Sequence, residues 1–339
     1  MMRSGREIEN LFKAFCKLNV LVVGDVMIDA YLWGKVDRIS PEAPVPIVAV
    51  NRRESLLGGA ANVALNLKAL GANPVLCSVI GEDARGNEFV ELLKKESLDT
   101  SGICRSRERI TTTKFRIIGN KAQMLRVDEE IDTDLIADDA DKLIKCVAST
   151  IENKGIDVII IQDYNKGVLT PFSISNILSI AQKKKIPVAV DPKKANFDAY
   201  RGVALFKPNL KELREGLKMD IESGNTSLIL NAIDKLHKNQ NVETVLTTLS
   251  EAGVLVSRRR NGEPREVVSV PAHLRSIADV SGAGDTVISV AALCLALGTT
   301  MHELASISNL AGGLVCEYSG VVPVNKEKLL SETLALISI

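Results

Sequence analysis

The chain has 339 residues, and its 42 Lys and Arg residues are balanced by 42 Asp and Glu residues, so its formal net charge is zero. A hydrophobic content of 46% with 25% charged residues is typical of a soluble globular protein and excludes an intrinsically disordered chain. Balanced charge gives no overall attraction to nucleic acid or to an anionic membrane, and no apolar run reaches the ~18 residues that cross a bilayer. We therefore expect a cytoplasmic protein with no nucleic-acid or membrane partner.

Apolar runs and helical patterns alternate along the chain. Runs rich in Val and Ile predict strands at residues 20–23, 45–50, 75–80, 158–161, 188–190, 204–206, 245–248 and 254–256. Helical patterns predict helices at residues 60–70, 84–96, 135–152, 171–184, 209–217, 284–297 and 301–317. This alternation predicts an α/β fold with a mostly parallel sheet covered by helices.

Two segments break the alternation. Residues 29–55 form an extended, Pro-punctuated stretch, and residues 110–128 have the pattern of a hairpin around Gly119 and Asn120. Both predict antiparallel strands rather than βα units, and together they could form a small sheet that projects from the main body as a lid. No linker or repeat is visible, so we expect residues 1–339 to form one domain with this lid.

The sharpest motif is the glycine-rich turn between Asp279 and Asp285, which directly precedes an apolar helical pattern. The small residues Gly282, Ala283 and Gly284 would leave backbone N–H groups free at the positive end of that helix, where phosphate groups bind. Asp285 would lie beside the anion, where a carboxylate is suited to accept a proton from a hydroxyl that attacks phosphorus. Considered alone, the motif is explained equally well as a plain helix cap.

A glycine pair precedes the predicted helix at residues 60–70. Gly58 and Gly59 allow the backbone to approach a ligand closely, and Asn62 could form hydrogen bonds with sugar hydroxyls. A helix-entry turn without any ligand is an equally good interpretation of these residues.

Acidic residues follow several predicted strands. They are Asp25, Asp29, Asp163 and Asp191. Ligands of open parallel sheets bind beyond the carboxyl ends of the strands, and carboxylates gathered there suit Mg²⁺ or sugar hydroxyls. A single Asp in such a place more often serves a turn, so the functional interpretation depends on their recurrence at one edge.

Further polar side chains could complete such a site. Asn209 and Glu212, at the start of the predicted helix at 209–217, could reach a metal ion through water, and Lys166 could meet a phosphate. The predicted lid adds cations that could hold a phosphate already present on a substrate, although exposed cations on a β-ribbon are usually only solvated. These cations are Lys114, Arg116 and Arg126.

The glycine pair and the glycine-rich turn, about two hundred residues apart by numbering, together resemble the paired signature of the ribokinase-like (PfkB) sugar kinases. The resemblance extends from about Asn19 to the end of the chain and includes Asn209 and Glu212. It implies a three-layer αβα fold with a β-sheet lid and a reaction that uses ATP and Mg²⁺. A monovalent cation such as K⁺ is a further candidate cofactor.

Four segments carry a narrower resemblance, to the D-glycero-D-manno-heptose 7-phosphate kinases within that family. They are VLVVGDVMIDAYLWGKVDRISPEAPVPIV, TTTKFRIIGNKAQMLRVDEE, QDYNKGVL and the region VDPK…NFDAYRG. In bifunctional members an adenylyltransferase domain with an H-x-G-H motif follows the kinase. No H-x-G-H motif occurs in this sequence, so we expect no adenylyltransferase domain, and the chain resembles a stand-alone kinase or the kinase half alone.

The resemblance also implies roles for individual residues. The residues implied in phosphoryl transfer are Asp285 as the base and Gly282, Ala283 and Gly284 as backbone donors. Asn209 and Glu212 would serve Mg²⁺ and the nucleotide phosphates, and Asp191 is a second candidate metal ligand. The residues that match the nucleotide side are Thr247, Ser250, Glu251, Gly253 and Asn309. The residues that match the sugar side are Asp29, Gly59, Asn62, Arg126 and Lys166.

With the resemblance, the sequence predicts Mg·ATP-dependent phosphorylation of the anomeric hydroxyl of D-glycero-D-manno-heptose 7-phosphate, in the assembly of the lipopolysaccharide core. The product would be the 1,7-bisphosphate. Two alternatives stay open, namely a kinase for another sugar (ribose, fructose or a sugar acid) and a catalytically silent nucleotide or sugar sensor. An NAD-dependent oxidoreductase would also suit a parallel sheet, but the phosphate-binding fingerprint expected after the first strand is absent.

Apolar residues in the first lid segment predict that the lid forms the interface of a homodimer, because exposed apolar edge strands pair with other chains. These residues are Tyr31, Leu32, Trp33, Ile47 and Val48.

Overall fold

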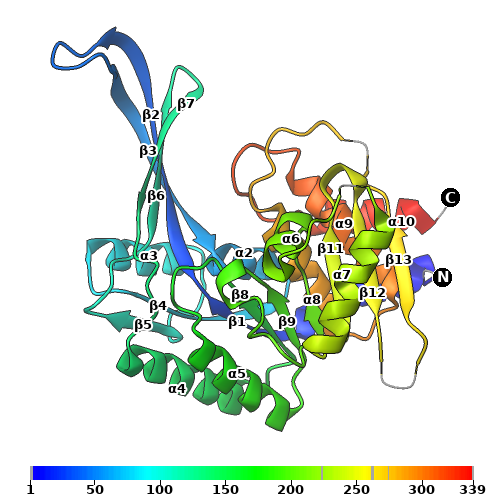
Figure 1. The fold of residues 1–339 in the computed structure, drawn as a ribbon. Coiled ribbons are helices and arrows are strands. Elements are labelled where there is room, and N and C mark those ends of the chain that lie inside the picture. Colours follow the sequence, from blue (N-terminus) through cyan, green and yellow to red (C-terminus); the bar gives the residue numbers. More distant parts are fainter. Residues whose placement is uncertain (1–2, 223, 261–262, 274, 338–339) are drawn as a thin grey trace.

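The computed structural model describes residues 3–222, 224–260, 263–273 and 275–337. Its main body is a nine-stranded sheet with helices on both faces, and a second sheet of four strands projects from one end of the body (Figure 1). The expected α/β body and projecting lid are thus both present.

The strands of the main sheet lie side by side in the order β13-β12-β11-β10-β9-β8-β1-β4-β5. Neighbours from β5 to β11 are parallel, whereas β12 and β13 run antiparallel at one edge. Their bounds are β1 Asn19–Gly24, β4 Asn73–Gly81, β5 Ile103–Ser106, β8 Val158–Gln162, β9 Val188–Asp191, β10 Leu205–Phe206, β11 Thr244–Thr248, β12 Val254–Arg258 and β13 Glu266–Val270. Because parallel strands end at the same edge, the loops after β1, β8, β9 and β10 converge there.

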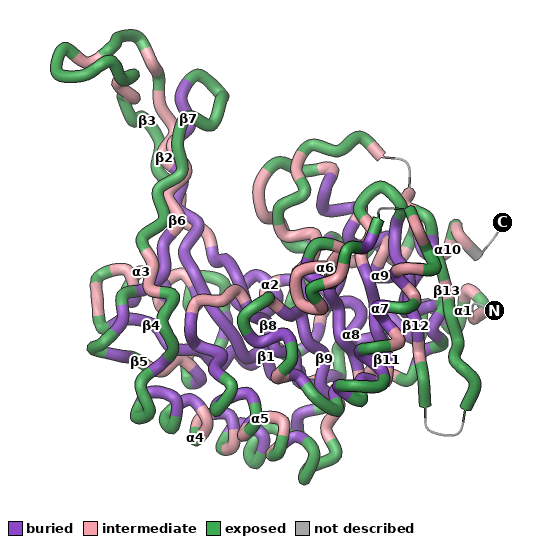
Figure 2. Tube along the Cα trace, in the orientation of Figure 1, coloured by how far each residue is buried: buried purple, intermediate pink, exposed green. Residues whose placement is uncertain are grey.

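Alternate residues of β1 point to opposite faces of the sheet, and each face has its own hydrophobic core. Val20 and Val22 pack on one face, and Leu21 and Val23 pack on the other, which explains the unbroken apolar run of this strand. The helices over the first core are α1 Gly5–Ala14, α2 Ala60–Ala69, α3 Ala84–Lys95, α8 Ala283–Ala296, α9 Met301–Val315 and α10 Lys326–Ile337. Those over the second are α4 Ala137–Lys154, α5 Pro171–Lys184, α6 Leu210–Leu217 and α7 Thr226–Asn239. Figure 2 shows the buried strands between the two helical layers.

The lid is a sheet with the strand order β3-β2-β6-β7. Its strands are β2 Val26–Ile39, β3 Pro46–Gly59, β6 Thr113–Gly119 and β7 Ala122–Glu129. Each hairpin is antiparallel as expected, and Asn120 and Lys121 form the second turn with φ of 52° and 69°. The two hairpins join through β2 and β6, which are parallel. The chain passes through β3, α2, β4, α3 and β5 between these strands, and such a long crossover permits parallel pairing.

Exposed apolar residues are present on the lid, but they differ from those expected. Tyr31 is buried, and the other four expected residues are half-buried. The large apolar side chains that are exposed on the lid are Ile39, Val45, Val50, Met124, Leu125 and Val127. The lid therefore offers apolar surface mainly on its outer strands and its tip.

Five elements lie outside the ranges that the sequence predicts, namely α1, α7, α10, β5 and β13. Three short 3₁₀ turns complete the described chain, and they are η1 Phe15–Lys17, η2 Lys194–Asn196 and η3 Ser250–Ala252. Across the described residues, no helix has the length and apolar character that crossing a membrane requires.

Candidate active site

Asp285 lies in the first turn of α8 and is almost completely buried, with 5% of its surface exposed. The Tyr164 hydroxyl donates to its Oδ1 at 2.6 Å, and Asn62 Nδ2 donates to its Oδ2 at 2.7 Å. Gln162 Nε2 makes a longer contact of 3.2 Å with Oδ1. Donors from α2, from β8 and from the loop after β8 thus hold a single carboxylate.

Burial raises the pKa of Asp285 to about 6, because a carboxylate removed from water is less stable in its ionised form. The nearby Asp191 carboxylate acts in the same direction, whereas the bonds from Tyr164 and Asn62 oppose the rise. Burial and the Asp285 carboxylate raise the pKa of Tyr164 well above 10, so its hydroxyl keeps its proton and acts as the donor. A carboxylate with a pKa near 6 is ionised at neutral pH and is still basic enough to accept a proton.

The glycine-rich turn places the start of α8 beside this carboxylate. Gly282 is the N-cap residue of α8 in the left-handed conformation, with φ of 79° and ψ of −4°. The Ala283 N–H donates to the Val280 carbonyl at a long 3.3 Å. Within the described segments the Gly284 N–H has no protein acceptor, so a donor remains at the positive end of the helix.

A buried ion pair lies against the same helix end. Lys207, just after β10, is 3% exposed, and its Nζ lies 3.0 Å from Asp191 Oδ2. A Cβ atom on Gly284 would lie 3.6 Å from Lys207 Nζ, which places this cation beside the first turn of α8. Gln162 Nε2 also donates to Asp191, at 3.0 Å, and so connects Asp191 with Asp285.

Asn209 and Glu212 form the capping box of α6. Asn209 Oδ1 accepts from the Glu212 N–H, and Glu212 Oε2 accepts from the Asn209 N–H, both at 2.8 Å. The other Glu212 oxygen accepts from Lys193, whose Nζ lies 5.6 Å from the centre of the Tyr164 ring. Both carboxylate oxygens of Glu212 are thus occupied, and its role at a metal stays a prediction.

The residues expected at the nucleotide lie around the ends of β11 and β13. Asn209 forms a β-bridge with Thr248, so the start of α6 adjoins the end of β11. Gly253 has φ of 85°, and a Cβ atom there would lie 2.1 Å from the Val270 carbonyl oxygen, so only glycine fits. Asn309 Nδ2 donates to the Pro271 carbonyl at 2.8 Å. The other expected nucleotide residues are Thr247, which is buried, and Ser250 and Glu251, which are exposed.

Two of the acidic residues at strand ends hold protein groups. Asp25 accepts backbone N–H groups from Tyr164, Lys166 and Val168 at 2.7, 3.2 and 3.1 Å. Asp163 accepts from side chains of the segment after β9, and these donors are Asn196 Nδ2 at 3.1 Å and the Tyr200 hydroxyl at 2.6 Å. Asp163 is fully buried among these partners, so its contacts assign it to loop structure and its role toward a sugar stays untested.

The expected lid cations gather at the base of the lid, together with three carboxylates. Lys114 Nζ lies 2.9 Å from Asp128 and 3.0 Å from Glu130, and Lys166 Nζ lies 2.6 Å from the second oxygen of Glu130. Arg126 Nε lies 2.9 Å from Asp128. Arg116 donates to Asp29, which faces Gly58 so closely that a Cβ atom there would lie 2.4 Å from the carboxylate. We call these seven charged residues the lid cluster: Asp29, Lys114, Arg116, Arg126, Asp128, Glu130 and Lys166.

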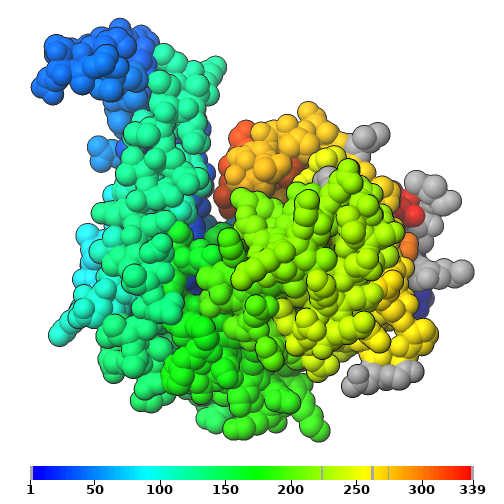
Figure 3. All heavy atoms as spheres, viewed as in Figure 1, coloured from blue at the N-terminus to red at the C-terminus, as the bar shows by residue number. Residues whose placement is uncertain are grey.

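A closed series of side-chain contacts, one strand pairing and short chain segments joins the buried carboxylate to the lid cluster and returns to it. One branch follows the start of α2 and β2, and the other follows the loop after β8. In order, its members are Asp285, Asn62, Gly59, Gly58, Asp29, Lys114, Glu130, Lys166 and Tyr164. The surface is hollowed between the projecting lid and the yellow-to-orange segments of the body (Figure 3).

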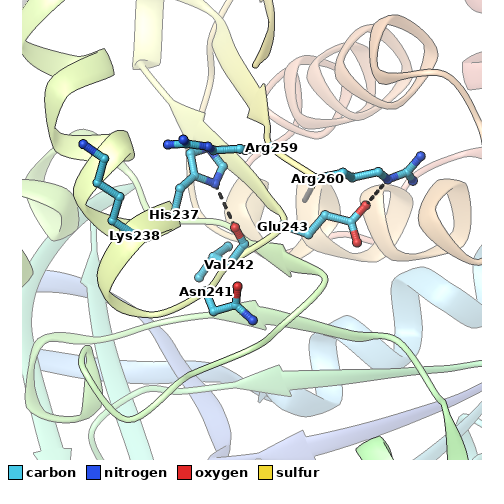
Figure 4. A pocket seen from close by; sticks show the side chains of 7 residues that line it. All are labelled: His237, Lys238, Asn241, Val242, Glu243, Arg259 and Arg260. Atoms are coloured by element: carbon cyan, nitrogen blue, oxygen red, sulfur yellow. Dashed lines mark hydrogen bonds and ion pairs between the residues drawn. The ribbon is translucent and has the colours of Figure 1, made fainter. Parts of the chain in front are cut away.

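A separate hollow of about 430 Å³ lies elsewhere, at the start of β11 and the end of β12 (Figure 4). It is lined by His237, Lys238, Asn241, Val242, Glu243, Arg259 and Arg260. The hollow lies at the edge where the parallel strands begin, whereas Asp285 lies at the edge where they end, so the two are on opposite sides of the sheet. His237 there bonds to the Val242 carbonyl at 2.8 Å, and Arg260 bonds to Glu243 at 2.6 Å.

Comparison with known proteins identifies the family to which the chain belongs. Residues 17–328 match the profile described as "pfkB family carbohydrate kinase". The chain belongs to the pfkB family of carbohydrate kinases. As a pfkB kinase it is an enzyme that phosphorylates a sugar, and its fold is ribokinase-like.

Two curated relatives of this pfkB chain have the same name. The chain is 38% identical over 324 residues to the "Bifunctional protein HldE" of Trichlorobacter lovleyi, which covers 96% of this chain and 64% of that protein. It is 40% identical over 299 residues to the protein of the same name from Aliarcobacter butzleri, with coverage of 88% and 61%. The chain therefore spans less than two thirds of the length of these relatives.

Solved structures agree with the family at the level of the fold. Phosphofructokinase-2 from Escherichia coli, in complex with potassium, superposes with a TM-score of 0.77 at 19% identity, covering 95% of this chain and 99% of that one. Ribokinase from Arabidopsis thaliana, complexed with ribose and ATP, gives a TM-score of 0.69 at 19% identity, covering 92% and 98%.

The ion pair of Lys207 and Asp191 gives a stability prediction. In Lys207→Met, Asp191 loses its cation in a buried position, so we expect the free energy of unfolding to fall by about 3–5 kcal/mol. Urea denaturation measures this change. The double variant Asp191→Asn/Lys207→Met buries no charge at either position and should recover most of the loss. A Lys207→Met variant as stable as the parent would contradict the importance of this pair.

Proposed function

We propose that this pfkB kinase transfers the γ-phosphoryl group of ATP to the anomeric hydroxyl of D-glycero-D-manno-heptose 7-phosphate, in the cytoplasmic assembly of the lipopolysaccharide core. The observation that carries the proposal is the closed series of contacts and short chain segments, which has a buried carboxylate at one side and the lid cations at the other. A sugar phosphate has matching groups, a hydroxyl to be deprotonated and a phosphate to be bound. The sequence resemblance to heptose 7-phosphate kinases supports the same substrate, and the relatives at 38% and 40% identity are bifunctional proteins. The proposal concerns the kinase reaction alone, and the one-domain organisation stays a prediction.

The hydrogen bonds at Asp285 indicate which oxygen would accept the proton. Each carboxylate oxygen has two lone-pair sites. Tyr164 and Gln162 occupy both sites of Oδ1, whereas Asn62 occupies one site of Oδ2. The anomeric hydroxyl would therefore donate to Oδ2 and lose its proton to it as the sugar oxygen attacks the γ-phosphorus. The bond from the γ-phosphorus to the β,γ-bridging oxygen breaks, and ADP leaves.

Cationic groups are placed to hold the negative charge of the phosphates. The Gly284 N–H and the Lys207 ammonium group lie at the start of α8, next to Asp285, and would receive the transferring phosphoryl group. The lid cluster would receive the phosphate that the sugar already has. The transferring phosphoryl group and the sugar phosphate would thus be bound at opposite ends of the substrate.

The site also fits Mg²⁺, which neutralises phosphate charge when it is bound with ATP. The Asp191 Oδ1 atom is buried and has no hydrogen-bond partner among the described residues, so it is a free hard oxygen ligand. Among the residues that the structure describes, no group of three or more His, Cys, Asp or Glu side chains is arranged to hold a metal ion. Such a donor set suits an ion held mainly by phosphates and water, with Asp191 as one carboxylate and Glu212 as a second if Lys193 releases it.

A turnover assay tests the proposal. With ATP and a panel of heptose 7-phosphate, unphosphorylated heptose, ribose and fructose, we expect the highest kcat/KM for heptose 7-phosphate. Asp285→Asn should lose about 10²- to 10⁴-fold in kcat while ATP still binds, because the acceptor of the proton is removed. Preference for an unphosphorylated pentose would overturn the substrate, and an unchanged kcat in Asp285→Asn would overturn the role of the base.

The pH dependence of kcat gives a second prediction. The base acts in its ionised form, so kcat should rise with pH through a value near 6, which is the pKa of Asp285. Tyr164→Phe removes a donor that stabilises the ionised form, so the pKa should increase and the rise should move upward by about one pH unit.

The matched control for that variant is Tyr200→Phe. The Tyr200 hydroxyl donates to Asp163 instead of Asp285, and its loss should leave the pH profile of kcat in place. A profile that is unchanged in Tyr164→Phe, or shifted equally in both variants, would contradict the assignment.

We also propose that the lid forms a homodimer. Leu125 is 55% exposed on β7 and belongs to the apolar surface of the lid. Leu125→Glu should shift the protein from dimer to monomer in light scattering. The new carboxylate would be buried in the interface without a counter-charge, which is costly. The control is Val267→Glu, on β13 of the main sheet, where a residue 38% exposed should tolerate the change. A wild-type monomer would exclude this interface.

A further inference from the structure

Glu130 binds two lysines that belong to different parts of the molecule. Its Oε2 lies 3.0 Å from Lys114 on the lid strand β6, and its Oε1 lies 2.6 Å from Lys166 on the loop after β8. About a fifth of each of these three side chains is exposed, so solvent screens the pairs only in part. Burial acts to raise the pKa of Glu130, but the bonds from Lys166 and Lys114 outweigh it and hold the pKa below the ordinary value. Glu130 is therefore an anion at neutral pH.

Lys166 is held in place independently of Glu130. Its N–H donates to Asp25 at 3.2 Å, and its carbonyl accepts from Arg109. Lys114 lies within the paired part of β6, opposite Asp128 of β7 and Asp29 of β2. Both lysines thus lie on backbone that is held without Glu130, and the Lys114 ammonium group has a second partner in Asp128.

Glu130 is less constrained than its two partners. The last pair in the β6–β7 ladder joins Thr113 to Glu129, and Glu130 follows it in a segment without regular structure. Its side chain can leave the lysines without breaking a ladder hydrogen bond. The structure therefore combines two lysines on anchored backbone with one glutamate just beyond the end of the β6–β7 ladder.

We propose that Glu130 occupies the position of the sugar phosphate in the free enzyme and must be displaced by it, which makes Glu130 a specificity-determining residue for phosphorylated sugars. The inference rests on the proposed function, since it places a substrate phosphate at the lid cluster. The ligand class is a sugar with a terminal phosphate dianion.

The charges explain the selectivity. The lid cluster has four cations and three carboxylates, so an added dianion would give it excess negative charge unless a carboxylate left. A phosphate monoester has a charge of about −1.5 to −2 and three acceptor oxygens at pH 7. It can therefore bind both lysines more strongly than the single carboxylate of Glu130 does. A neutral sugar hydroxyl offers no charge in exchange, so it leaves Glu130 in place.

Glu130→Gln tests the inference because it keeps the shape of the side chain and removes its charge. We expect the KM for heptose 7-phosphate to fall about fivefold, with the KM for ATP unchanged. The dissociation constant of inorganic phosphate, measured by calorimetry without turnover, should fall by a similar factor. Glu129→Gln is the matched control, because Glu129 is exposed on β7 and lies outside the lid cluster, and it should change neither value.

The two readouts separate this inference from the proposed function. Tighter phosphate binding in Glu130→Gln without turnover of heptose 7-phosphate would support the inference and overturn the substrate. Turnover of heptose 7-phosphate with the same or a higher KM in Glu130→Gln would overturn the inference and leave the proposed function standing. Equal changes in Glu130→Gln and Glu129→Gln would also overturn it, since they would reflect net charge alone.

Discussion

The site depends on one buried carboxylate that binds backbone rather than ligand. Asp25, at the end of β1, accepts the N–H groups of Tyr164, Lys166 and Val168. Burial, together with the nearby Asp163 carboxylate, raises the pKa of Asp25 to about 6, and the three backbone donors oppose that rise. The loop after β8 has no helix or strand of its own, so these three bonds take the place of regular structure.

Fixing this loop positions both halves of the site. Tyr164 reaches Asp285 at the start of α8, and two residues later Lys166 reaches Glu130 at the base of the lid. One segment of five residues therefore contacts both the proposed proton acceptor and the proposed phosphate site at the lid. This coupling explains how a lid joined to the body mainly through β2 and β3 can contribute to a site at the edge of the main sheet.

Much of the architecture could be predicted from the sequence, because burial on both faces leaves unbroken apolar strands and broken alternation marks the lid. The parallel pairing of β2 and β6 could not be predicted, since the sequence pattern of a strand is the same for both directions of pairing.

Within the site, the two glycine motifs were enough to predict Asp285 and Asn62 as site residues. The structure brings these two side chains into hydrogen-bond contact. Tyr164 and Gln162 were missed in favour of Asp163, although side chains alternate along an extended segment. Gln162 and Tyr164 are two residues apart, so in an extended segment their side chains lie on the same side, and both reach Asp285. Asp163, between them, faces the other way and binds Tyr200. Lys207 gave no signal, because a buried lysine is recognised only through its partner.

The most direct test of the account is a crystal structure with heptose 7-phosphate and a non-hydrolysable ATP analogue. We expect the anomeric oxygen within hydrogen-bond distance, about 2.6–3.2 Å, of Asp285 Oδ2, with the sugar phosphate on Lys114 and Lys166 and Glu130 turned away. An anomeric oxygen on Oδ1 or out of reach of Asp285, or a sugar phosphate bound outside the lid cluster, would contradict it.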